Sequence, residues 1–450
     1  MSVLPMANHR NPAVALAVLL AFLLAACSET TTRVPVRASG AEAVRTSVPL
    51  NRRPVRRRFP ATPPSKSLRF EQDEIRVAVL LPLTGGSAFV GQALLDAASM
   101  ALFDALDPRI RVLPFDTLGT PEGAVLAAGE ALKVRPQIVI GPLFAETIRA
   151  AGPIISARGL KLIGFSNDVS VASRRNLLLS FLPEDEVRRV VEFAAREGAT
   201  RFAGLIPDSA YGAKVLSSLA DSVIRARGTV TSIERYEDDA QKAAGPVRRL
   251  ANYDVRSRAY KREKAFLKSL NDDLADEILK SIAHLETLES PGFDAVLVPE
   301  GGEMLRSLAP MLSFYEVDPK EVHYLGTGLW DDEELILEPS LEGAWFAGAP
   351  LESSRAFRSR FEALFDYQPP RIASLGYDAM SLVTILARRE MRDERFSDKA
   401  LFHPNGFRGV DGVFRFRQNG TAERRLAVIE IRADGFKTVS PAPKSFAGRR

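Results

Sequence analysis

Short apolar runs alternate with amphipathic segments of helical length from Ile75 onward, and this alternation most constrains the fold. Ile75–Leu81 is an almost continuous apolar run, and Gly91–Leu106 after it carries apolar residues at helical spacing. The same order of elements begins again at Arg201–Ile206. Strands that alternate with helices of about ten or more residues form βαβ units, which build parallel sheets. The sequence therefore predicts an α/β protein made of two Rossmann-like βαβ lobes joined by a hinge.

Each lobe is expected to consist of one continuous piece and one returning piece. The predicted bounds are residues 71–183 with about 332–390 for lobe 1, 184–331 with about 391–440 for lobe 2, and 441–450 for a basic tail. Near the end of the chain, the turn Gln418–Gly420 lies between two strand candidates, Gly412–Phe416 and Arg424–Ile431, and this pattern predicts a hairpin.

An insertion rich in charged residues interrupts the second lobe at Asp254–Leu288. Apolar side chains recur in it at spacings of three and four residues, which is the pattern of one face of an amphipathic helix. That face either packs on its own lobe or docks a partner protein. The candidate docking residues are Leu267, Leu270, Leu274 and Ile278.

The N-terminal segment has the pattern of an export signal. Its apolar run Ala13–Ala26 is shorter than the roughly 20 residues that a transmembrane helix needs, and it fits the apolar region of a secretory signal peptide over residues 1–26. The run ends in Leu-Ala-Ala-Cys27, which resembles a bacterial lipobox. By that resemblance the chain would be cut before Cys27 and anchored to a membrane through lipid on its sulfur. The alternative is a plain signal peptide with an incidental cysteine.

Residues 27–70 are rich in proline and arginine and show no apolar periodicity, so we expect a solvated tether that begins at the lipidated cysteine. The cluster Arg52–Arg58 could instead attract anionic lipid headgroups. The expected location is the cell envelope, facing the periplasm. Ser28 after the cysteine resembles the sorting signal of outer-membrane lipoproteins, which favours the outer membrane over the inner one.

The sequence lacks the motifs of several common enzyme classes. It has no H-E-x-x-H pair, no P-loop and no G-x-S-x-G turn, and its four histidines are scattered. The acidic run Asp331–Glu334 is typical of a solvated turn. A formal net charge of +4, spread along the chain, does not indicate nucleic-acid binding. We therefore expect no catalytic residue, no metal site and no cofactor, and the protein is not predicted to be an enzyme.

A series of motifs resembles, in order and spacing, those of type I periplasmic binding proteins, which include the branched-chain amino-acid receptors. The motifs are Arg76–Gly86 (RVAVLLPLTGG), Phe89–Gln92 (FVGQ), Asp96–Ala98 (DAA), Ile138–Pro142 (IVIGP), Gly164–Asn167 (GFSN), Asp208–Gly212 (DSAYG) and Ala373–Ala379 (ASLGYDA). The resemblance implies a ligand cleft outside the carboxyl ends of the strands, closed by a hinge between the lobes.

The same resemblance implies a set of cleft residues that could hold a small molecule. The candidates are Ser87, Gly141, Pro142, Ser166, Asn167, Tyr211, Glu300 and Trp330. Backbone N–H groups and small hydroxyls among them would hold a carboxylate, and Tyr211 and Trp330 would form apolar walls. The pattern departs from that of amino-acid receptors at Leu143 and Phe144, whose bulky apolar groups would narrow the pocket, and at Asn167, which replaces the usual threonine. Binding of a free amino acid is therefore disfavoured.

A narrower resemblance is to the penicillin-binding-protein activator lipoproteins, whose C-terminal domain has this fold and stimulates a peptidoglycan synthase by contact. The lipobox, the tether and the helical insertion agree with it. The resemblance covers the binding-fold portion only, because residues 28–69 are too few for the helical-repeat domain of the enterobacterial members. It implies a non-enzymatic regulator with a penicillin-binding protein as its partner. The alternative is a solute-binding receptor of an ABC transporter for amino acids or related small molecules.

Overall fold

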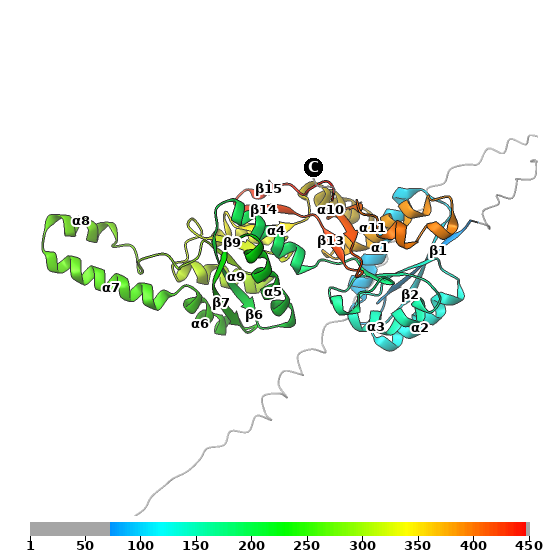
Figure 1. Cartoon of the computed structure of the whole chain (residues 1–450), viewed down its shortest axis with the longest axis horizontal. Coiled ribbons are helices and arrows are strands. Elements are labelled where there is room, and N and C mark those ends of the chain that lie inside the picture. The colour runs from blue at the N-terminus through cyan, green and yellow to red at the C-terminus, as the bar shows by residue number, and fades with distance from the viewer. Residues whose placement is uncertain (1–72, 447–450) are drawn as a thin grey trace, which may run out of the picture. The chain divides into compact units, whose positions relative to one another are not determined.

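The computed structural model describes residues 73–446, which form two α/β lobes (Figure 1). The predicted two-lobed fold class is confirmed. The predicted signal peptide, the lipidation site Cys27 and the tether lie outside the described residues, as does the end of the basic tail.

Lobe 1 is built on a five-stranded parallel sheet in the order β2-β1-β3-β4-β5. Its strands are β1 (Ile75–Leu81), β2 (Ile110–Asp116), β3 (Ile138–Ile140), β4 (Leu162–Gly164) and β5 (Asn176–Leu178). Its connecting helices are α1 (Ala88–Ala105), α2 (Pro121–Lys133) and α3 (Ala145–Ser156). In β1, Val77 and Val79 pack in one apolar core, while Ala78 and Leu80 pack in the other. Apart from Arg76, the strand is apolar because both of its faces are covered.

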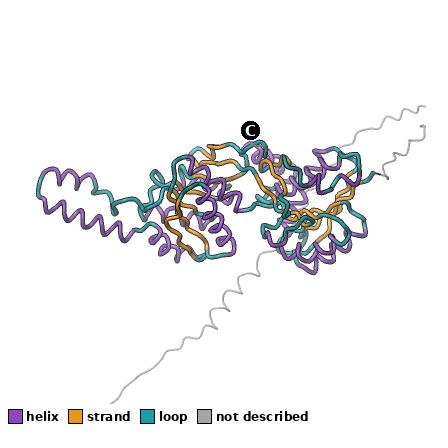
Figure 2. The backbone as a smooth tube through the Cα atoms, in the orientation of Figure 1, coloured by secondary structure: helices purple, strands orange, loops and turns teal. Residues whose placement is uncertain are grey.

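Lobe 2 is built on a seven-stranded sheet in the order β15-β14-β10-β9-β8-β6-β7, in which β14 and β15 form an antiparallel edge. Its strands are β6 (Arg201–Pro207), β7 (Thr229–Tyr236), β8 (Ala295–Leu297), β9 (His323–Gly326), β10 (Trp345–Gly348), β14 (Ala427–Arg432) and β15 (Gly435–Ser440). Its helices include α4 (Pro183–Arg196), α5 (Ala210–Arg225), α6 (Ala240–Leu250) and α9 (Gly302–Phe314). Figure 2 shows helices around the strands of both lobes.

The returning segments differ from the predicted bounds. Strand β10 pairs with β9 and β14, so lobe 2 extends past residue 332, where the return to lobe 1 was expected. The chain goes back to lobe 1 with α10 (Leu351–Phe365) and α11 (Ala373–Ala387), and α11 packs against α1. It stays there through the short helix α12 (Asp398–Leu401), because Leu401 packs in the core of lobe 1.

One of the two strands of the predicted C-terminal hairpin is also wrong. Strand β12 (Gly412–Phe416) pairs with β11 (Phe407–Gly409) and with β13 (Ala422–Arg424), and all three lie outside the sheet of lobe 2. Phe414 and Phe416 bury their rings in the core of lobe 1. The following strand β14 crosses to lobe 2, so segment 391–424 was assigned to the wrong lobe. Apolar alternation identifies a strand, but it does not tell which of two apolar sheets the strand joins.

The short 3₁₀ helices lie in connecting segments. They are η1 (Val169–Val171), η2 (Gly328–Trp330), η3 (Glu333–Leu337), η4 (Pro339–Leu341) and η5 (Arg392–Glu394). The acidic run predicted as a solvated turn falls at the start of η3, where the Asp332 side chain caps the N–H of Glu334.

The insertion forms two helices instead of the single amphipathic helix that was expected. Helices α7 (Tyr253–Leu270) and α8 (Asp273–Ser281) are joined at Asn271, whose φ of 53° ends α7, and Asp272 caps α8. Figure 1 shows this helical hairpin projecting from lobe 2. Leu267 is buried within the hairpin, whereas Leu270, Leu274 and Ile278 are exposed. The turn therefore divides the predicted stripe into one packed residue and three surface residues.

Helix α1 is the one described helix that is long and apolar enough to cross a membrane by those two measures. It lies against α11 in lobe 1, and Leu94 and Ala98 on it are buried in the core of that lobe. Its apolar composition is explained by this packing.

Candidate functional site

A cavity of about 410 Å³ lies between the two lobes. Lobe 1 supplies the loops after β3 and β4, the segment after β5 and the start of α11, while lobe 2 supplies α4, α5 and η2. The apolar part of its lining consists of Leu143, Phe144, Ala145, Phe165, Phe181, Pro183, Leu329, Ile372 and Leu375. The polar part consists of Ser166, Asn167, Asp168, Ser180, Glu186, Tyr211 and Arg371. We call it the inter-lobe cavity.

The loop after β3 brings two bulky side chains into the inter-lobe cavity. Gly141 has a φ of 87°, and a β-carbon there would overlap the carbonyl oxygen of Leu80. Glycine is required at this position because both the backbone conformation and the close approach exclude a side chain. Leu143 and Phe144 follow directly and line the cavity, as their positions in the sequence predicted.

The loop after β4 places polar groups on the opposite part of the wall. Ser166 is buried, and its hydroxyl accepts a hydrogen bond from the N–H of Asp168 at 3.0 Å. The carbonyl oxygen of Asn167 accepts a hydrogen bond at 3.3 Å from Nζ of Lys214, which stands on α5 of lobe 2. This bond joins the two lobes at the rim of the cavity.

Tyr211 contributes a partly buried aromatic ring from the first turn of α5. Its hydroxyl lies 3.2 Å from Oγ1 of Thr327. Burial raises the pKa of Tyr211, and the nearby carboxylate of Glu186 adds to this effect. The phenol is therefore neutral at physiological pH and can donate one hydrogen bond.

An ion pair between the two lobes lines the cavity. Nη2 of Arg371 donates to Oε1 of Glu186 at 2.6 Å, and the guanidinium of Arg371 lies 3.9 Å from the ring centroid of Phe181. Burial alone would lower the pKa of Arg371, but Glu186 outweighs it and raises the pKa. A β-carbon at Gly328 would overlap this guanidinium, so the glycine leaves room for the pair. The charges of Arg371 and Glu186 are therefore compensated within the protein.

The structure brings together some of the predicted cleft residues and separates others. Ser166, Asn167 and Tyr211 line the inter-lobe cavity, and Gly141 and Pro142 shape its loop. These five residues lie together at the cavity, and their role in holding a ligand stays a prediction.

Three other candidates do not line this cavity. Trp330 is fully buried in the core of lobe 2, near Phe346, so it cannot form a wall of the cleft. Leu329, one residue earlier in η2, takes that place, because neighbouring residues of a helical turn point in different directions. Glu300 accepts a hydrogen bond from the hydroxyl of Tyr236 at 2.7 Å, and Ser87 stands at the start of α1.

Sequence reasoning missed Arg371, Glu186 and Phe181. Arg371 precedes the motif at Ala373, and Glu186 lies in the acidic first turn of α4, which reads as an ordinary helix start. Because Arg371 and Glu186 are 185 residues apart in the chain, no local sequence pattern indicates that they pair. Within residues 73–446, no group of three or more histidine, cysteine or acidic side chains is placed to hold a metal ion.

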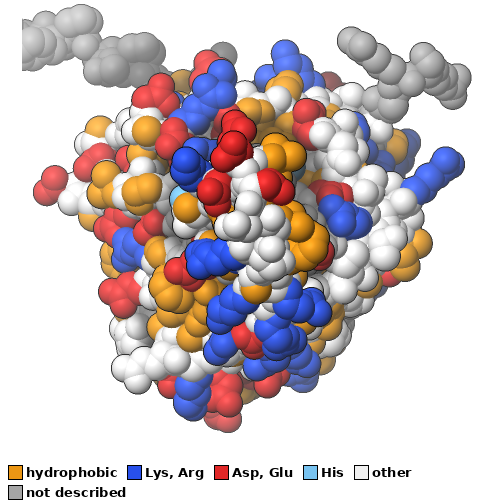
Figure 3. All heavy atoms as spheres, turned by 90° about the vertical axis from the view of Figure 1, so that its left-hand side faces the viewer, with side chains coloured by type: hydrophobic (Ala, Val, Ile, Leu, Met, Phe, Trp, Pro, Cys, Tyr) orange, Lys and Arg blue, Asp and Glu red, His pale blue; other side chains and the backbone are white. Residues whose placement is uncertain are grey.

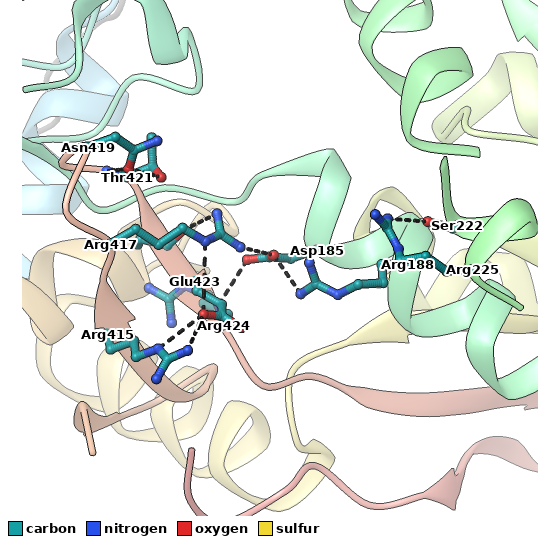
Figure 4. A network of polar contacts seen from close by, with 11 residues as sticks. Asp185, Arg188, Ser222, Arg225, Arg415, Arg417, Asn419, Thr421, Glu423 and Arg424 are labelled. Atoms are coloured by element: carbon teal, nitrogen blue, oxygen red, sulfur yellow. Dashed lines mark hydrogen bonds and ion pairs between the residues drawn. The ribbon is translucent and has the colours of Figure 1, made fainter. Parts of the chain in front are cut away.

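A second polar network ties the segments that cross between the lobes (Figure 4). The carboxylate of Asp185, on α4, accepts hydrogen bonds from Arg188 at 2.7 Å, from Arg417 at 2.9 Å and from the backbone N–H of Arg424 at 2.9 Å. The side chain of Arg424 pairs with the buried Asp378 at 3.0 Å. The carboxylate of Asp185 therefore holds together the two segments that cross between the lobes, one after β5 and one after β13.

Comparison with known proteins identifies the family of this chain. A family model described as periplasmic binding protein matches residues 74–436. Among solved structures, a putative branched-chain amino acid ABC transporter protein from Rhodospirillum rubrum has a TM-score of 0.63 at 17% identity, over 81% of this chain and 100% of that one. An ABC transporter substrate-binding protein from Sphaerobacter thermophilus has a TM-score of 0.59 at 16% identity, over 82% and 98% of the two chains. At these identities the likeness concerns the fold.

Two curated proteins are similar in sequence over shorter regions. An uncharacterised protein of Rickettsia prowazekii is 27% identical over 183 residues, which are 40% of this chain and 48% of that protein. The penicillin-binding protein activator LpoA of Klebsiella pneumoniae is 29% identical over 142 residues, which are 31% of this chain and 20% of that protein. The matched regions thus span about half of one relative and a fifth of the other.

The family match and the architecture agree. Membership implies a location in the periplasm or the cell envelope and a role in binding, which is typically non-enzymatic in this family. With two α/β lobes, a cavity between them and a family match across almost all of the described residues, the chain belongs to the periplasmic binding protein family and has the type I fold.

Proposed function

We propose that this protein is a regulator that faces the periplasm and activates a peptidoglycan synthase of the penicillin-binding class by direct contact. The observation that carries the proposal is the ion pair between Arg371 and Glu186 in the inter-lobe cavity. An amino-acid receptor must offer its zwitterionic ligand an opposite charge or strong hydrogen bonds at each end. Here the charges of Arg371 and Glu186, which face the cavity from lobe 1 and lobe 2, are already bound to each other.

The apolar lining supports the same conclusion. Leu143 and Phe144 stand where a receptor needs small polar groups, and Phe165 and Phe181 add two further rings. Burying a carboxylate or an ammonium group among these side chains would cost several kcal/mol unless new hydrogen bonds compensated it. Even a neutral polar group without a hydrogen bond costs roughly 2–7 kcal/mol to bury. The cavity is thus poorly suited to a free amino acid.

Similarity to the activator LpoA of Klebsiella pneumoniae adds independent support. The matched region lies in a chain whose fold is that of a binding protein and whose sequence lacks the common catalytic motifs. In such a protein, contact with another protein is the simplest way to change a reaction that the protein does not itself catalyse.

We propose the helical hairpin α7–α8 as the surface that contacts the synthase. Five large apolar side chains are exposed on it, namely Val255, Phe266, Leu270, Leu274 and Ile278. The exposed basic residues of α7 are Arg258, Lys261, Arg262 and Lys268. Figure 3 looks onto this end of the molecule, where hydrophobic side chains lie among charged ones. Exposed acidic residues lie on the hairpin too, namely Asp254 and Glu263 on α7 and Asp273, Asp276 and Glu277 on α8. Apolar residues surrounded by charges of both signs are typical of a docking surface.

Crosslinking in intact cells tests this proposal. The full chain and its variant Leu274→Asp are crosslinked in the organism that makes them, and the captured proteins are labelled with fluorescent penicillin. We expect a labelled penicillin-binding protein with the wild-type chain and a strongly reduced amount with Leu274→Asp. The matched control is Leu337→Asp, an equally exposed leucine on η3. A labelled partner captured equally by all three chains would exclude the hairpin, and no labelled partner with any chain would exclude the activator function.

Membrane anchoring through Cys27 is part of the proposal. A lipid at this position would hold the binding fold near the membrane while the basic tether of residues 27–70 lets it reach a partner. Anchoring in the outer membrane is favoured by Ser28. Mass spectrometry of the N-terminal peptide is expected to find diacylglycerol on the sulfur of Cys27. An unmodified thiol would refute the anchor without affecting the proposed partner.

A solute receptor of an ABC transporter is the second candidate function. It is favoured by the remaining volume of the inter-lobe cavity and by Ser180, which lines that cavity and whose buried hydroxyl has no hydrogen-bond partner within residues 73–446. A thermal-shift screen with amino acids and related small molecules separates the two. A ligand at a hundredfold excess over its dissociation constant would stabilise the protein by about 2.7 kcal/mol. A shift of that size with a free amino acid would favour the receptor over the activator.

A further inference from the structure

A second cavity, of about 180 Å³, lies beside the segments that cross between the lobes. Residues Asp185, Arg188, Arg189, Glu192 and Arg196 line it from one face of α4, at the spacing of successive helical turns. The crossing segment 424–426 and the end of the described chain form the rest. Its lining carries five arginines and only two acidic residues, so it is strongly positive. We call it the arginine cavity.

The two acidic residues do not neutralise this charge. Asp185 is buried and already accepts three hydrogen bonds, from Arg188, Arg417 and the N–H of Arg424, as Figure 4 shows. Glu192 is exposed to solvent, and Arg196 hydrogen-bonds only its backbone carbonyl. The charges of Arg189, Arg196 and Arg425 therefore have no carboxylate partner in the part of the chain that the structure describes.

Arg189 is held in place by neutral acceptors. Its Nε donates to the carbonyl oxygen of Leu426 at 2.7 Å, and Nη2 donates to the hydroxyl of Ser440 at 2.8 Å. Burial and the positive charge of Arg196 lower the pKa of Arg189 to about 10. The side chain is thus a fixed cation in a positive environment, which an anion would stabilise.

Arg425 presents an unpaired donor at the same cavity. Its Nε is buried and has no hydrogen-bond partner within residues 73–446. The guanidinium lies 4.7 Å from the ring centroid of Phe446, and the guanidinium of Arg415 lies 4.3 Å from that ring. The aromatic ring therefore holds the cation by its face and leaves its N–H edge for another acceptor.

We propose that the arginine cavity binds an oxyanion of the phosphate type. Planar guanidinium groups bind phosphate oxygens through paired N–H donors, and several of them can share one anion. One water occupies about 30 Å³, which is a small part of the cavity volume of about 180 Å³. The cavity therefore has room for a phosphate group. The anion is either free phosphate or the phosphodiester of an anionic lipid headgroup. The site is independent of the partner contact proposed above.

The position of the site gives the anion a structural consequence. Leu426 follows the crossing after β13, and α4 follows the crossing after β5. An anion held by Arg189 and Arg196 on one side and by Arg425 on the other would join these two segments. Binding would therefore stabilise the folded protein by mass action.

Titration with inorganic phosphate tests the proposal. The full chain, in an uncharged detergent that shields its apolar N-terminal segment, is titrated by calorimetry at constant ionic strength with chloride as the balancing ion. We expect saturable phosphate binding, weakened at least about tenfold in the double variant Arg196→Gln/Arg425→Gln. The control Arg158→Gln removes the same charge from an exposed position outside the cavity and is expected to bind as the wild type does.

Two results would overturn the proposal, namely no saturable binding to the wild type or equal affinity in the double variant and the control. If the double variant does not fold, Arg196→Gln alone replaces it, because this side chain is exposed and makes only a backbone contact within its own helix. Its expected loss is smaller, about threefold.

A parallel titration with glycerophosphoglycerol, a soluble phosphodiester headgroup, identifies the source of the anion. Tighter binding of the diester than of inorganic phosphate would assign the site to a lipid headgroup. The reverse order would assign it to free phosphate. If neither compound binds, the proposal is wrong.

Discussion

Arg371 and Glu186 form an ion pair of 2.6 Å across the cleft, although one stands before α11 in lobe 1 and the other in the first turn of α4 in lobe 2. The Glu186 side chain is 5% exposed and that of Arg371 is 30% exposed. This pair joins the lobes at the place where a receptor of this fold would hold its ligand. The pair therefore contributes to the contact between the lobes and to the chemistry of the cavity.

Removing one partner of this pair is expected to destabilise the protein. Arg371→Met leaves the carboxylate of Glu186 buried without a cation, and we expect a loss of about 2 kcal/mol in the free energy of unfolding, less than for a fully buried pair because Arg371 is partly solvated. The double variant Glu186→Gln/Arg371→Met removes both charges and should recover most of the loss. Urea denaturation gives the free energies of unfolding of the wild type, of each single variant and of the double variant. Additive losses in the double variant would show that the pair is not coupled.

Glycine is required at position 91, within the motif Phe89–Gln92. A β-carbon there would overlap the carbonyl oxygen of Pro82, and a backbone atom cannot move aside as the end of a side chain can. We expect Gly91→Ala to cost about 2–3 kcal/mol. Gly129 in α2 is the matched control, because a β-carbon there meets nothing within 4 Å. Gly129→Ala should stabilise by up to about 1 kcal/mol. Thermal unfolding tests the pair, and equal effects would contradict this assignment.

Asp294 is expected to make stability depend on acid pH. Burial tends to raise its pKa, but hydrogen bonds from the side chain of Arg201 and from the N–H groups of Thr200 and Arg201 outweigh burial and hold the pKa of Asp294 below its ordinary value. A carboxylate with a lowered folded-state pKa stabilises the protein above its unfolded pKa of about 4, and this contribution disappears as the pH falls through the folded value.

Asp294→Asn tests this expectation. The variant should be less stable than the wild type by about 2 kcal/mol at neutral pH, and the difference should shrink steadily below pH ~4 as the wild-type carboxylate is protonated. Unfolding free energies measured at a series of pH values give the comparison. A difference that stays constant down to the lowest pH would refute the role of ionisation.

The two faces of the helical hairpin should respond differently to substitution. Leu267 is 4% exposed and packs within the hairpin, whereas Leu274 is 67% exposed. Leu267→Ala is expected to loosen α7 and α8, with a cost of about 2 kcal/mol visible as faster amide exchange in these helices. Leu274→Ala should leave the exchange unchanged. Faster exchange in both variants would mean that Leu274 is a packing residue and not a free contact.

Much of the fold could be predicted from sequence because the apolar residues of each run indicate which of its faces are buried. Apart from Arg76, the run Ile75–Leu81 is apolar since both faces of β1 are buried. Local pattern carries no information about distant partners, however. Strand β10 is as apolar as β1, and only its pairing with β9 and β14 places it in lobe 2.

The candidate site was predictable where a residue acts through its local backbone and not where it acts through a distant side chain. Gly141, Ser166 and Tyr211 stand in recognisable loops and helix starts, and they lie where the pattern placed them. Trp330 was misplaced by one residue in a helical turn, so that Leu329 lines the cavity instead. The pair of Arg371 and Glu186 exists only after both lobes have folded.

The most direct test of the proposed function is the rate at which a purified penicillin-binding synthase polymerises glycan strands, measured with and without the full chain. The synthase is the one captured by crosslinking to the wild-type protein. We predict a faster rate in the presence of the chain, lost with Leu274→Asp on the hairpin and kept with Leu337→Asp on η3. A rate that the wild-type chain leaves unchanged would contradict the activator function.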